Sequence, residues 1–346
     1  MLLRVMRLPF VVAVFACLSF APTASATPAF RDSVLSTSAA RSLQATAEWG
    51  GATVASDGET VTIYFSDSYP VDAARAKQWA DFMTSLVHGS ELSTVAIHLA
   101  PLTEVVQVCG GGALACYNPR RATIYAPADD VDPTTSAKGI LTHEYGHHVA
   151  ASRTNPPFTS VDYGTKRWAS YENVCARTRA GELYPGAEDA QNYALNPGEG
   201  FAESYRVLNE QKLGLPLEEW FLTTSLQPDA TALSLLEQDV LTPWTANTTR
   251  KLTAKLSAKM RSRVFAVRVP YDGELSVSPR QTRSVKVSVS LSAKGGESET
   301  RSFTRAAGRA LTATVCGARA YTVRLKLTGT VTKATRTTVS LTMSTP

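Results

Sequence analysis

The stretch that decides the first part of the fold is "TSAKGILTHEYGHHVAAS", Thr135 to Ser152. It holds three of the chain's five histidines within six residues. His143 and His147 are four residues apart, and on a helix this spacing turns both imidazoles to one side, one turn apart, where they can share a metal ion. The pattern His-Glu-x-x-His therefore predicts a metal-binding helix. A polar helix that holds no ion is the plainer alternative.

The flanking residues favour a helix as the carrier of this pattern. Asp132 fits the N-cap and Pro133 the first helical residue, where a missing N–H costs nothing. At 100° per residue, Glu144 lies 100° from His143 and flanks the pair without having to be a ligand. His148 lies at 140°, too far round to share the ion, and we interpret it as a neighbour of the site or a surface residue.

A third ligand must come from elsewhere, because catalytic zinc takes three protein ligands and leaves one position for water. The segment "NPGEGFAESYRVLNE", Asn196 to Glu210, places Glu199 and Glu203 four residues apart on one helical face. Two such carboxylates repel each other unless cations or donors hold them. A metal ion and the N–H of a ligand imidazole would do so. The spacing leaves open which carboxylate binds the ion, and a solvated acidic helix is the alternative.

The two motifs together resemble a known family. HEYGH followed by NPGEGFAESY is similar to the Glu-zincin metallopeptidases, which include thermolysin, and the second motif is most similar to the lethal-factor type of secreted toxin protease. The resemblance implies a zincin-like domain of mixed sheet and active-site helices that binds Zn²⁺ and cleaves a peptide or protein. The roles that it implies are zinc ligand for His143, His147 and Glu199, general base for Glu144, orientation of His143 for Glu203, and oxyanion stabilisation for Tyr193.

Other function classes fit the chain less well. The sequence has no G-x-S-x-G pattern, and its cysteines are accounted for by disulfides, so a Ser or Cys nucleophile is disfavoured. It also has no phosphate-binding glycine loop or nucleic-acid motif, so no specific nucleic-acid partner is expected. Two alternatives to a general endopeptidase remain: a catalytically silent zincin-fold binding protein, and a toxin-like protease that acts on one host protein.

The first 26 residues predict a secreted protein. Arg4 and Arg7 precede an apolar run from Leu8 to Phe20, and Ala24-Ser25-Ala26 forms a small-residue cleavage site, as in a signal peptide. Lipoprotein anchoring through Cys17 is the alternative, disfavoured by the better cleavage site that follows. No later apolar run approaches about 18 residues, so no transmembrane segment is expected in the mature chain.

Signal cleavage would leave four cysteines, an even number that predicts two disulfides in an exported chain. "CGGGALAC" is short and glycine-rich, which favours Cys109–Cys116 among the three possible pairings. Cys175–Cys316 then follows by elimination and would tie the two halves of the protein together.

Residues 27–59 are rich in Ala, Ser and Thr and are expected to be loosely ordered. Residues 60–246 are expected to form the catalytic domain. "VTIYF", "TVAIHLA", "EVVQV" and "ATIYA" are its predicted strands, with an amphipathic helix from Val71 to His88 and a loop-rich stretch over 151–197. Leu217 to Trp244 is expected to be helical, with five probable core residues: Trp220, Phe221, Leu233, Leu236 and Val240. We interpret Asp129, Asp130 and Asp132 as capping and solvated residues, with Ca²⁺ ligation as the alternative.

Residues 247–346 are expected to form a small all-β sandwich, because segments such as "SVKVSVSLSA" alternate with period two between turn signals. The predicted fold class is therefore α+β, a zincin-like domain followed by this basic β-sandwich. Residues 247–346 carry 19 Lys and Arg against 4 Asp and Glu, net +15, whereas residues 27–246 carry 14 against 26, net −12. An anionic cell-surface polymer is the expected partner of the basic domain. Attraction between the two domains, or solubility alone, are the alternatives.

Overall fold

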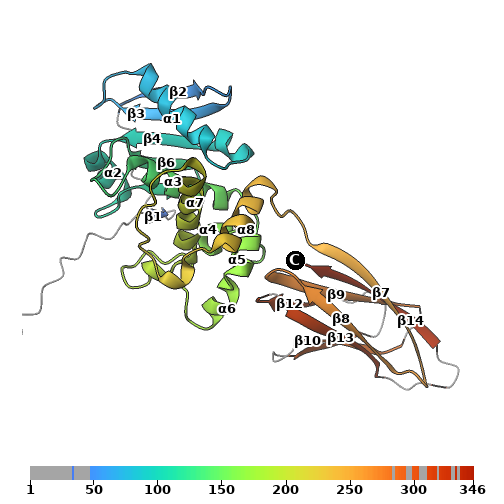
Figure 1. Ribbon diagram of the computed structural model, residues 1–346. Helices are drawn as coiled ribbons and strands as arrows, with labels where there is room; N and C mark the ends of the chain where they lie inside the picture. Colours follow the sequence, from blue (N-terminus) through green and yellow to red (C-terminus); the bar gives the residue numbers. More distant parts are fainter. Residues whose placement is uncertain are drawn as a thin grey trace, which may run out of the picture.

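The computed structural model describes residues 33–34, 47–282, 285–293, 298–303, 310–317, 319–328, 332 and 336–346. The predicted signal peptide, with Cys17, lies outside these residues. Figure 1 shows two parts side by side, a sheet with helices followed by a second part built from strands. The protein is therefore a mixed α+β molecule with a sheet-rich C-terminal part.

The first part contains a six-stranded mixed sheet in the order β1-β5-β6-β4-β3-β2. Its centre is parallel (β3, β4, β6), and β2 and β5 run antiparallel to their neighbours β3 and β6. Along β3, Val61, Ile63 and Phe65 are fully buried while Thr62 and Tyr64 are partly exposed, the alternation expected of a half-buried strand. The strands are β1 (Ser33–Val34), β2 (Glu48–Val54), β3 (Thr60–Ser66), β4 (Ala96–Ala100), β5 (Cys116–Asn118) and β6 (Thr123–Pro127).

Two helices cover the buried face of this sheet, α1 (Ala73–Ser85) and α3 (Ala137–Ala151). Their apolar side chains, such as Met83 of α1 and Ile140 of α3, form one core with the buried residues of β3, β4 and β6. The sheet thus supplies a rigid base under α3, the helix that carries the histidines (Figure 1).

The start of α3 differs from the sequence prediction. The N-cap is Ser136, whose Oγ accepts the N–H of Gly139 at 2.8 Å, and not Asp132. Asp132 instead accepts the N–H of Thr134 in the preceding turn, at 2.8 Å. Asp130 accepts the N–H of Ala137 at 2.9 Å, so the helix begins four residues later than expected with two of its free N–H groups satisfied.

Two further predictions in the first part were wrong. The segment "EVVQV", expected as a strand, lies in helix α2 (Leu102–Cys109). The region expected to be loosely ordered contains β2, which pairs with β3 over its whole length. Gly50 adopts φ +114° there, and a Cβ would lie 2.4 Å from the carbonyl oxygen of Ile63, so this strand requires glycine at that position.

The helical elements that follow α3 form the lower half of the first part. The stretch 151–197, expected to be loop-rich, contains three short helices and a 3₁₀ turn. In the stretch 217–244, Leu233, Leu236 and Val240 are buried, whereas Trp220 and Phe221 are only half-buried. The elements are α4 (Ser160–Tyr163), α5 (Lys166–Tyr171), α6 (Val174–Arg179), η3 (Tyr193–Leu195), α7 (Pro197–Leu213), η4 (Thr224–Leu226) and α8 (Ala230–Leu241); two others, η2 (Ser90–Thr94) and α2, lie earlier in the chain.

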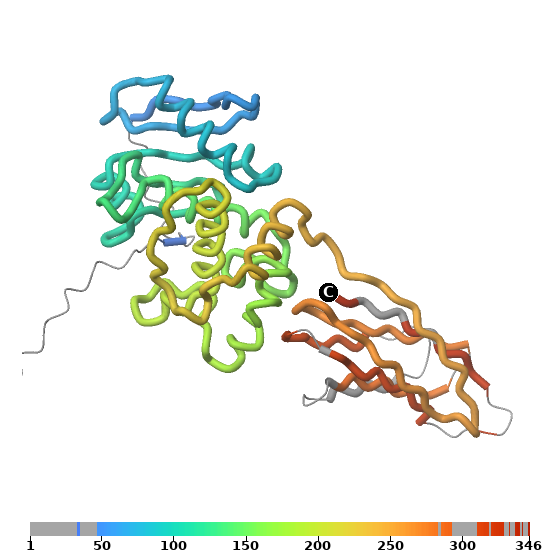
Figure 2. The backbone as a smooth tube through the Cα atoms, in the orientation of Figure 1, coloured from blue at the N-terminus to red at the C-terminus, as the bar shows by residue number. Residues whose placement is uncertain are grey.

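The C-terminal part consists of two four-stranded sheets, ordered β11-β10-β13-β8 and β12-β9-β14-β7, and every pairing in them is antiparallel. Valine and leucine side chains from both sheets form one core, the arrangement expected of a β-sandwich. The tube in Figure 2 shows how its long strands run alongside each other. The strands are β7 (Thr248–Ser257), β8 (Ser262–Val269), β9 (Gly273–Gln281), β10 (Val287–Ala293), β11 (Ser298–Phe303), β12 (Leu311–Val315), β13 (Arg319–Leu327) and β14 (Arg336–Thr345).

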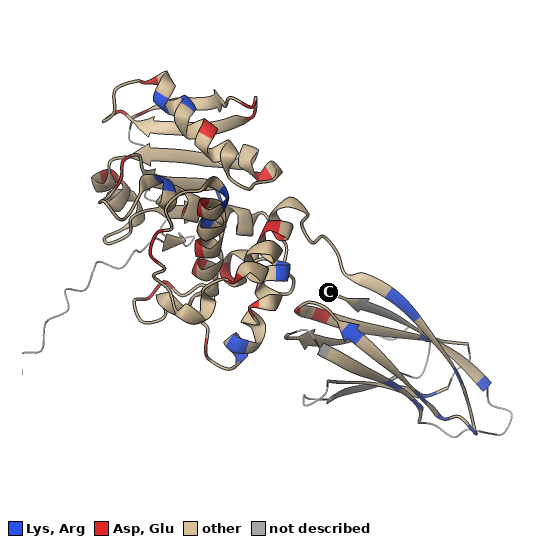
Figure 3. Ribbon diagram, in the orientation of Figure 1, with Lys and Arg blue, Asp and Glu red and all other residues tan. Residues whose placement is uncertain are grey.

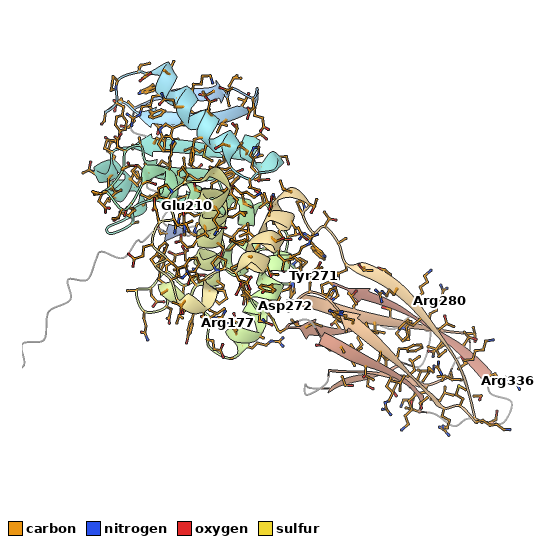
Figure 4. All side chains as sticks on the ribbon, in the orientation of Figure 1. Arg177, Glu210, Tyr271, Asp272, Arg280 and Arg336 are labelled. Atoms are coloured by element: carbon orange, nitrogen blue, oxygen red, sulfur yellow. A yellow bond between two sulfur atoms is a disulfide. The ribbon has the colours of Figure 1, made fainter. Side chains whose placement is uncertain are left out.

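A covalent and polar junction joins the two parts. The disulfide Cys175–Cys316 links α6 to the residue after β12, and its Cα atoms are 5.2 Å apart. The Lys166 ammonium donates to the carbonyl oxygen of Asp272 at 2.8 Å, and the N–H of Asp272 donates to Ser170 Oγ at 2.8 Å. Figure 4 labels Asp272 at this boundary.

The second disulfide, Cys109–Cys116, closes the loop after α2, with its Cα atoms 5.5 Å apart. Both predicted pairings are therefore confirmed, and two disulfides of this kind suit an extracellular protein. Among the described residues, no helix combines the length and the apolar character needed to cross a membrane.

Candidate metal centre

The two helices that carry the motif residues, α3 and α7, approach closely at Gly146. A Cβ at this position would lie 2.9 Å from Ala202 Cα and 3.1 Å from its carbonyl oxygen. A side chain there would therefore push the helices apart. Their contact brings His143 and His147 on α3 against Glu199 and Glu203 on α7.

The start of α7 sets the position of Glu199. Asn196 is the N-cap, and its Oδ1 accepts the N–H of Gly198 at 3.0 Å, while Pro197 occupies the first helical position. Glu199 lies in the first turn, where the positive end of the helix dipole favours a carboxylate. Glu203 follows one turn later on the same face.

His143, His147 and Glu199 form a buried group with metal-ligand geometry. The Glu199 Oε2 atom lies 3.3 Å from His143 Nε2 and 3.4 Å from His147 Nε2. The three ligand atoms all lie within 4.8 Å of one another, and all three residues are 0% exposed. Ligand atoms of a tetrahedral zinc site, with bonds of about 2.0–2.1 Å, lie about 3.3–3.4 Å apart. The residues therefore fit an ion of this kind.

Glu203 lies behind His143, on the side away from Glu199. His143 Nδ1 lies 3.1 Å from Glu203 Oε2, and a proton on Nδ1 that is donated to this carboxylate would leave the Nε2 lone pair for an ion. Burial disfavours the charged form of Glu203, but the Arg206 guanidinium and His143 outweigh it and lower the pKa of this carboxyl below its usual value. Glu203 thus fixes the ring and stays ionised.

Glu144, the predicted general base, is fully buried on α3, next in sequence to His143. Helical geometry turns its side chain 100° from that of His143, beside the histidine pair. A carboxylate at this place could exchange a proton with a group beside an ion held by His143, His147 and Glu199, without being a ligand itself.

Two aromatic residues border the group. Tyr193, on η3, donates its hydroxyl to Glu199 Oε2 at 3.1 Å. Its ring stacks on Phe221, with the centroids 6.4 Å apart, and the Phe221 ring lies 5.8 Å from the ring of His143. The sequence prediction placed Tyr193 at the site but assigned Phe221 to the core, whereas Phe221 is a half-buried neighbour of His143.

His148 is buried but belongs to a different set of contacts from His143, His147 and Glu199. Its Nδ1 lies 3.0 Å from the Tyr117 hydroxyl and its Nε2 lies 3.0 Å from the carbonyl oxygen of Glu91, so it links α3 to the sheet. Burial is the main cause that lowers the pKa of His148. Asp129 also has protein partners, since it binds Arg75 at 2.6 Å and Tyr69 at 2.8 Å.

Sequence reasoning missed a charged cluster behind Glu203. Arg206 lies between Glu203 and Glu210 and is 2% exposed. Their spacing, three and four residues, was visible in "EGFAESYRVLNE" and predicts contact on one helical face. The cluster also binds the backbone of Glu218, whose N–H donates to Glu210 Oε2; this residue comes from the loop after α7 and has no such signal in the sequence.

No protein-family model matches this chain, and no curated protein matches it. Among solved structures, the crystal structure of the Yersinia pseudotuberculosis-derived mitogen (YPM) matches with a TM-score of 0.23 and 11% sequence identity, over 29% of this chain and 87% of that chain. A likeness of this strength carries no information on fold or function. The functional argument therefore depends on the geometry of the site.

Proposed function

We propose that this protein is a secreted zinc-dependent endopeptidase of the Glu-zincin type. The observation that carries the proposal is the buried group of His143, His147 and Glu199, with Glu144 beside it and Glu203 bonded to His143. Two histidines and a glutamate are one of the donor sets of catalytic zinc. Fully buried carboxylates and imidazoles are costly unless something compensates their charge, and a divalent cation would do so here.

The proposed reaction is hydrolysis of a peptide bond. Zinc bound by the three ligands supplies a Lewis acid that polarises a carbonyl and lowers the pKa of water towards neutrality. Glu144 accepts the proton of the attacking water and later delivers it to the leaving amine. Glu203 keeps the ring of His143 in place during these steps through the bond at Nδ1.

The aromatic pair has two roles in this proposal. The Tyr193 hydroxyl donates to Glu199 Oε2 at 3.1 Å, and by turning its one proton from Glu199 it would become a donor for the oxygen on which negative charge develops. The half-buried Phe221 ring, next to His143, offers an apolar surface to a substrate side chain. We therefore expect cleavage next to apolar residues.

A chelator experiment tests the proposed activity. The secreted chain is incubated with a peptide library and with casein, before and after removal of metal by a chelator and after return of Zn²⁺. The proposal expects cleavage that chelation abolishes and zinc restores, with apolar residues next to the cut. Cleavage that survives chelation contradicts it. Zinc binding without any cleavage favours the catalytically silent binding protein, and cleavage of a single host protein alone favours the toxin-like protease.

A second function is favoured by the outer faces of the C-terminal sheets. Lys251 and Lys255 are exposed on β7 on either side of Thr253. Across the sheet, Thr253 pairs with Ser340, which pairs with Arg280, so the register places Lys251, Lys255 and Arg280 on one outward face. Figure 3 shows Lys and Arg on several strands of this part. This face fits an anionic cell-surface polymer that would hold the enzyme at the envelope.

A further inference from the structure

Arg206 is a buried cation fixed between two carboxylates of its own helix. Its Nε donates to Glu203 Oε2 at 2.9 Å, and its Nη atoms donate to Glu203 Oε1 and to Glu210 Oε1. The Arg206 residue is 2% exposed and Glu203 is 0% exposed. The guanidinium holds both oxygens of Glu203, a bidentate grip that fixes the plane of that carboxylate.

The same carboxylate holds the ligand ring. Glu203 Oε2 accepts from Arg206 Nε and, at 3.1 Å, from His143 Nδ1. A shift of the guanidinium would therefore turn the carboxylate and, with it, the imidazole whose Nε2 faces Glu199. Arg206 is one side chain removed from the metal group.

On its other side, the cluster reaches the loop after α7. Arg206 Nη2 donates to the carbonyl oxygens of Glu218 and Glu219, at 3.5 and 3.4 Å. Glu210 Oε2 accepts the N–H of Glu218 at 3.3 Å. Figure 4 labels Glu210 among the helices of the first part. The loop is therefore held directly against α7 two residues before Phe221.

This loop also holds the start of the histidine helix. Glu218 Oε1 accepts the N–H of Ser136 at 3.1 Å and its hydroxyl at 2.5 Å, and Ser136 is the N-cap of α3. Arg206 is therefore linked to α3 at two places. Glu218 links it to the start of the helix at Ser136, and Glu203 links it to His143. The guanidinium thus contacts α7 and the Phe221 loop directly, and α3 through Glu203 and Glu218.

The geometry points to a specific role, which rests on the proposed function: we propose that Arg206 is a positioning residue that sets the orientation of His143 for metal binding and holds the Phe221 loop beside it. Only a planar fork with several donors can bind Glu203, Glu210 and two carbonyl oxygens at once. A lysine keeps the charge but supplies a single point donor, so it would leave this set of contacts incomplete.

A purely structural ion pair is the competing explanation, and the chain offers a matched control. Arg167 pairs with the buried Asp239 at 2.6 Å, and Asp239 also accepts from the Thr165 hydroxyl at 2.7 Å. This pair ties α5 to α8 and is not bonded to His143 or Glu203. Arg167→Lys therefore perturbs a partly buried ion pair of similar chemistry without touching the metal group.

The test measures Zn²⁺ affinity by competition with a chromophoric chelator, together with the melting temperature without metal. Replacing a residue that orients a metal ligand typically weakens metal binding about 10- to 100-fold. Because Arg206 acts through Glu203, we expect Arg206→Lys to weaken Zn²⁺ binding about 10-fold. Arg167→Lys should lower the melting temperature and leave the affinity within about twofold. In the Co²⁺-loaded protein, the visible absorption bands should shift for Arg206→Lys and not for the control.

Glu210→Gln provides a second variant that preserves side-chain size and leaves the Arg206–Glu203 contact intact. It should weaken Zn²⁺ binding by a smaller factor, about threefold, because one anchor of the guanidinium loses its charge. If Arg206→Lys does not fold, the Zn²⁺ affinity of Glu210→Gln tests the positioning role instead. Wild-type affinity in every folded variant would overturn the positioning role while leaving the proposed function intact. Failure of the wild-type protein to bind Zn²⁺ would instead overturn the proposed function, and the inference with it.

Discussion

The metal-group helices and the C-terminal sheets place their charged side chains in opposite ways. On α3 and α7, six ionisable residues that contact or flank the ion group are at most 2% exposed: His143, Glu144, His147, Glu199, Glu203 and Arg206. In the C-terminal part, the core consists of Ala, Val and Leu, and Asp272 at the junction is the one buried charged residue among those described. Arg280 and Arg336, labelled in Figure 4, lie on its exposed surface.

This difference shows where the molecule tolerates the cost of buried charge. An apolar interior with outward charges is what burial of apolar area alone would select. Charges concentrated inside one pair of helices need compensating partners, because each unpaired buried charge costs several kcal/mol. The first part therefore holds the buried group that could bind a metal ion, and the second carries a charged surface. The predictions that follow test this division, from the largest expected effect to the smallest.

The largest effect is expected for Glu144→Gln. Loss of the general base should lower turnover about 10³-fold or more, with metal content unchanged, because the amide keeps the shape but cannot accept the proton. Peptide cleavage and metal analysis on the same sample measure both. As a control, Glu237→Gln changes a carboxylate on the outside of α8 that pairs with Lys212, and should leave activity unchanged. Near-normal turnover in Glu144→Gln would remove the buried carboxylate from the mechanism.

The next largest effect is on the free energy of unfolding. It should differ between the disulfide that joins the two regions and the disulfide within the first region. Cys175 and Cys316 are 141 residues apart, whereas Cys109 and Cys116 are 7 apart. Loop-closure entropy predicts a loss of about 5 kcal/mol for a double alanine variant of the long bridge and about 2 kcal/mol for the short one. Denaturant unfolding measures both losses. Equal losses would show that the long bridge does not constrain the unfolded chain as its separation implies.

Lys166 is an exception to this division, because it is a cation buried at the junction between the two regions. Burial lowers the pKa of Lys166 to about 8, although Asp272 and Asp239 oppose this shift, and its ammonium also faces the Trp244 ring at 4.6 Å. Between pH 8 and 10.5 the unfolded chain keeps a proton that the folded chain has released. The contribution of this group to stability therefore rises with pH across that window.

The variant Lys166→Met isolates this contribution. From pH 8 to 10.5, the wild-type protein should gain stability relative to the variant, on the order of 2–3 kcal/mol. Denaturant unfolding of both proteins at the two pH values gives the difference directly. Parallel stability curves would mean that the Lys166 ammonium is not held in a charge-disfavouring site.

The smallest effect is expected on the exposed face. Replacing Lys251, Lys255 and Arg280 by serine should lower the salt concentration at which the protein leaves a dextran sulfate column, without a change in stability. The attraction is screened as the Debye length falls from about 10 Å at 0.1 M to about 3 Å at 1 M salt. The matched control removes three exposed cations from the first part: Lys77, Arg121 and Lys212. An equal shift in both triple variants would show that total charge, and not this face, governs binding.

The residues that could be predicted from the sequence are those with local patterns. The spacing of His143 and His147 predicted α3, and the spacing of Glu199 and Glu203 predicted α7 with the residues that the structure brings together. Period-two alternation predicted the C-terminal strands. The disulfides followed from a short glycine-rich loop and the even cysteine count.

The misses have physical causes that the local sequence does not carry. The apolar run in α2 is too short for periodicity to separate helix from strand. Strand β2 was missed because it contains glycines, which have low strand propensity. Gly50 is required there because a Cβ would collide with the carbonyl oxygen of Ile63. Asp132 and Pro133 matched the N-cap pattern, but Ser136 is the N-cap of α3, and Asp130 accepts the N–H of its first residue, Ala137. Glu218 and Phe221 could not be placed from local sequence. They come from a loop without regular structure, and long-range contacts determine their positions.

The central claim, that His143, His147 and Glu199 bind one divalent ion, is tested most directly by calorimetric titration of the metal-free protein with Zn²⁺. The account predicts one ion per wild-type chain, and at least a 100-fold weaker affinity in Glu199→Gln, because a charged carboxylate ligand is replaced by a neutral amide. Glu203→Gln should still bind one ion, about 10- to 100-fold more weakly, because it keeps all three ligands and loses the carboxylate that orients His143 and pairs with Arg206. Absence of binding in the wild-type protein, or wild-type affinity in Glu199→Gln, would contradict the account.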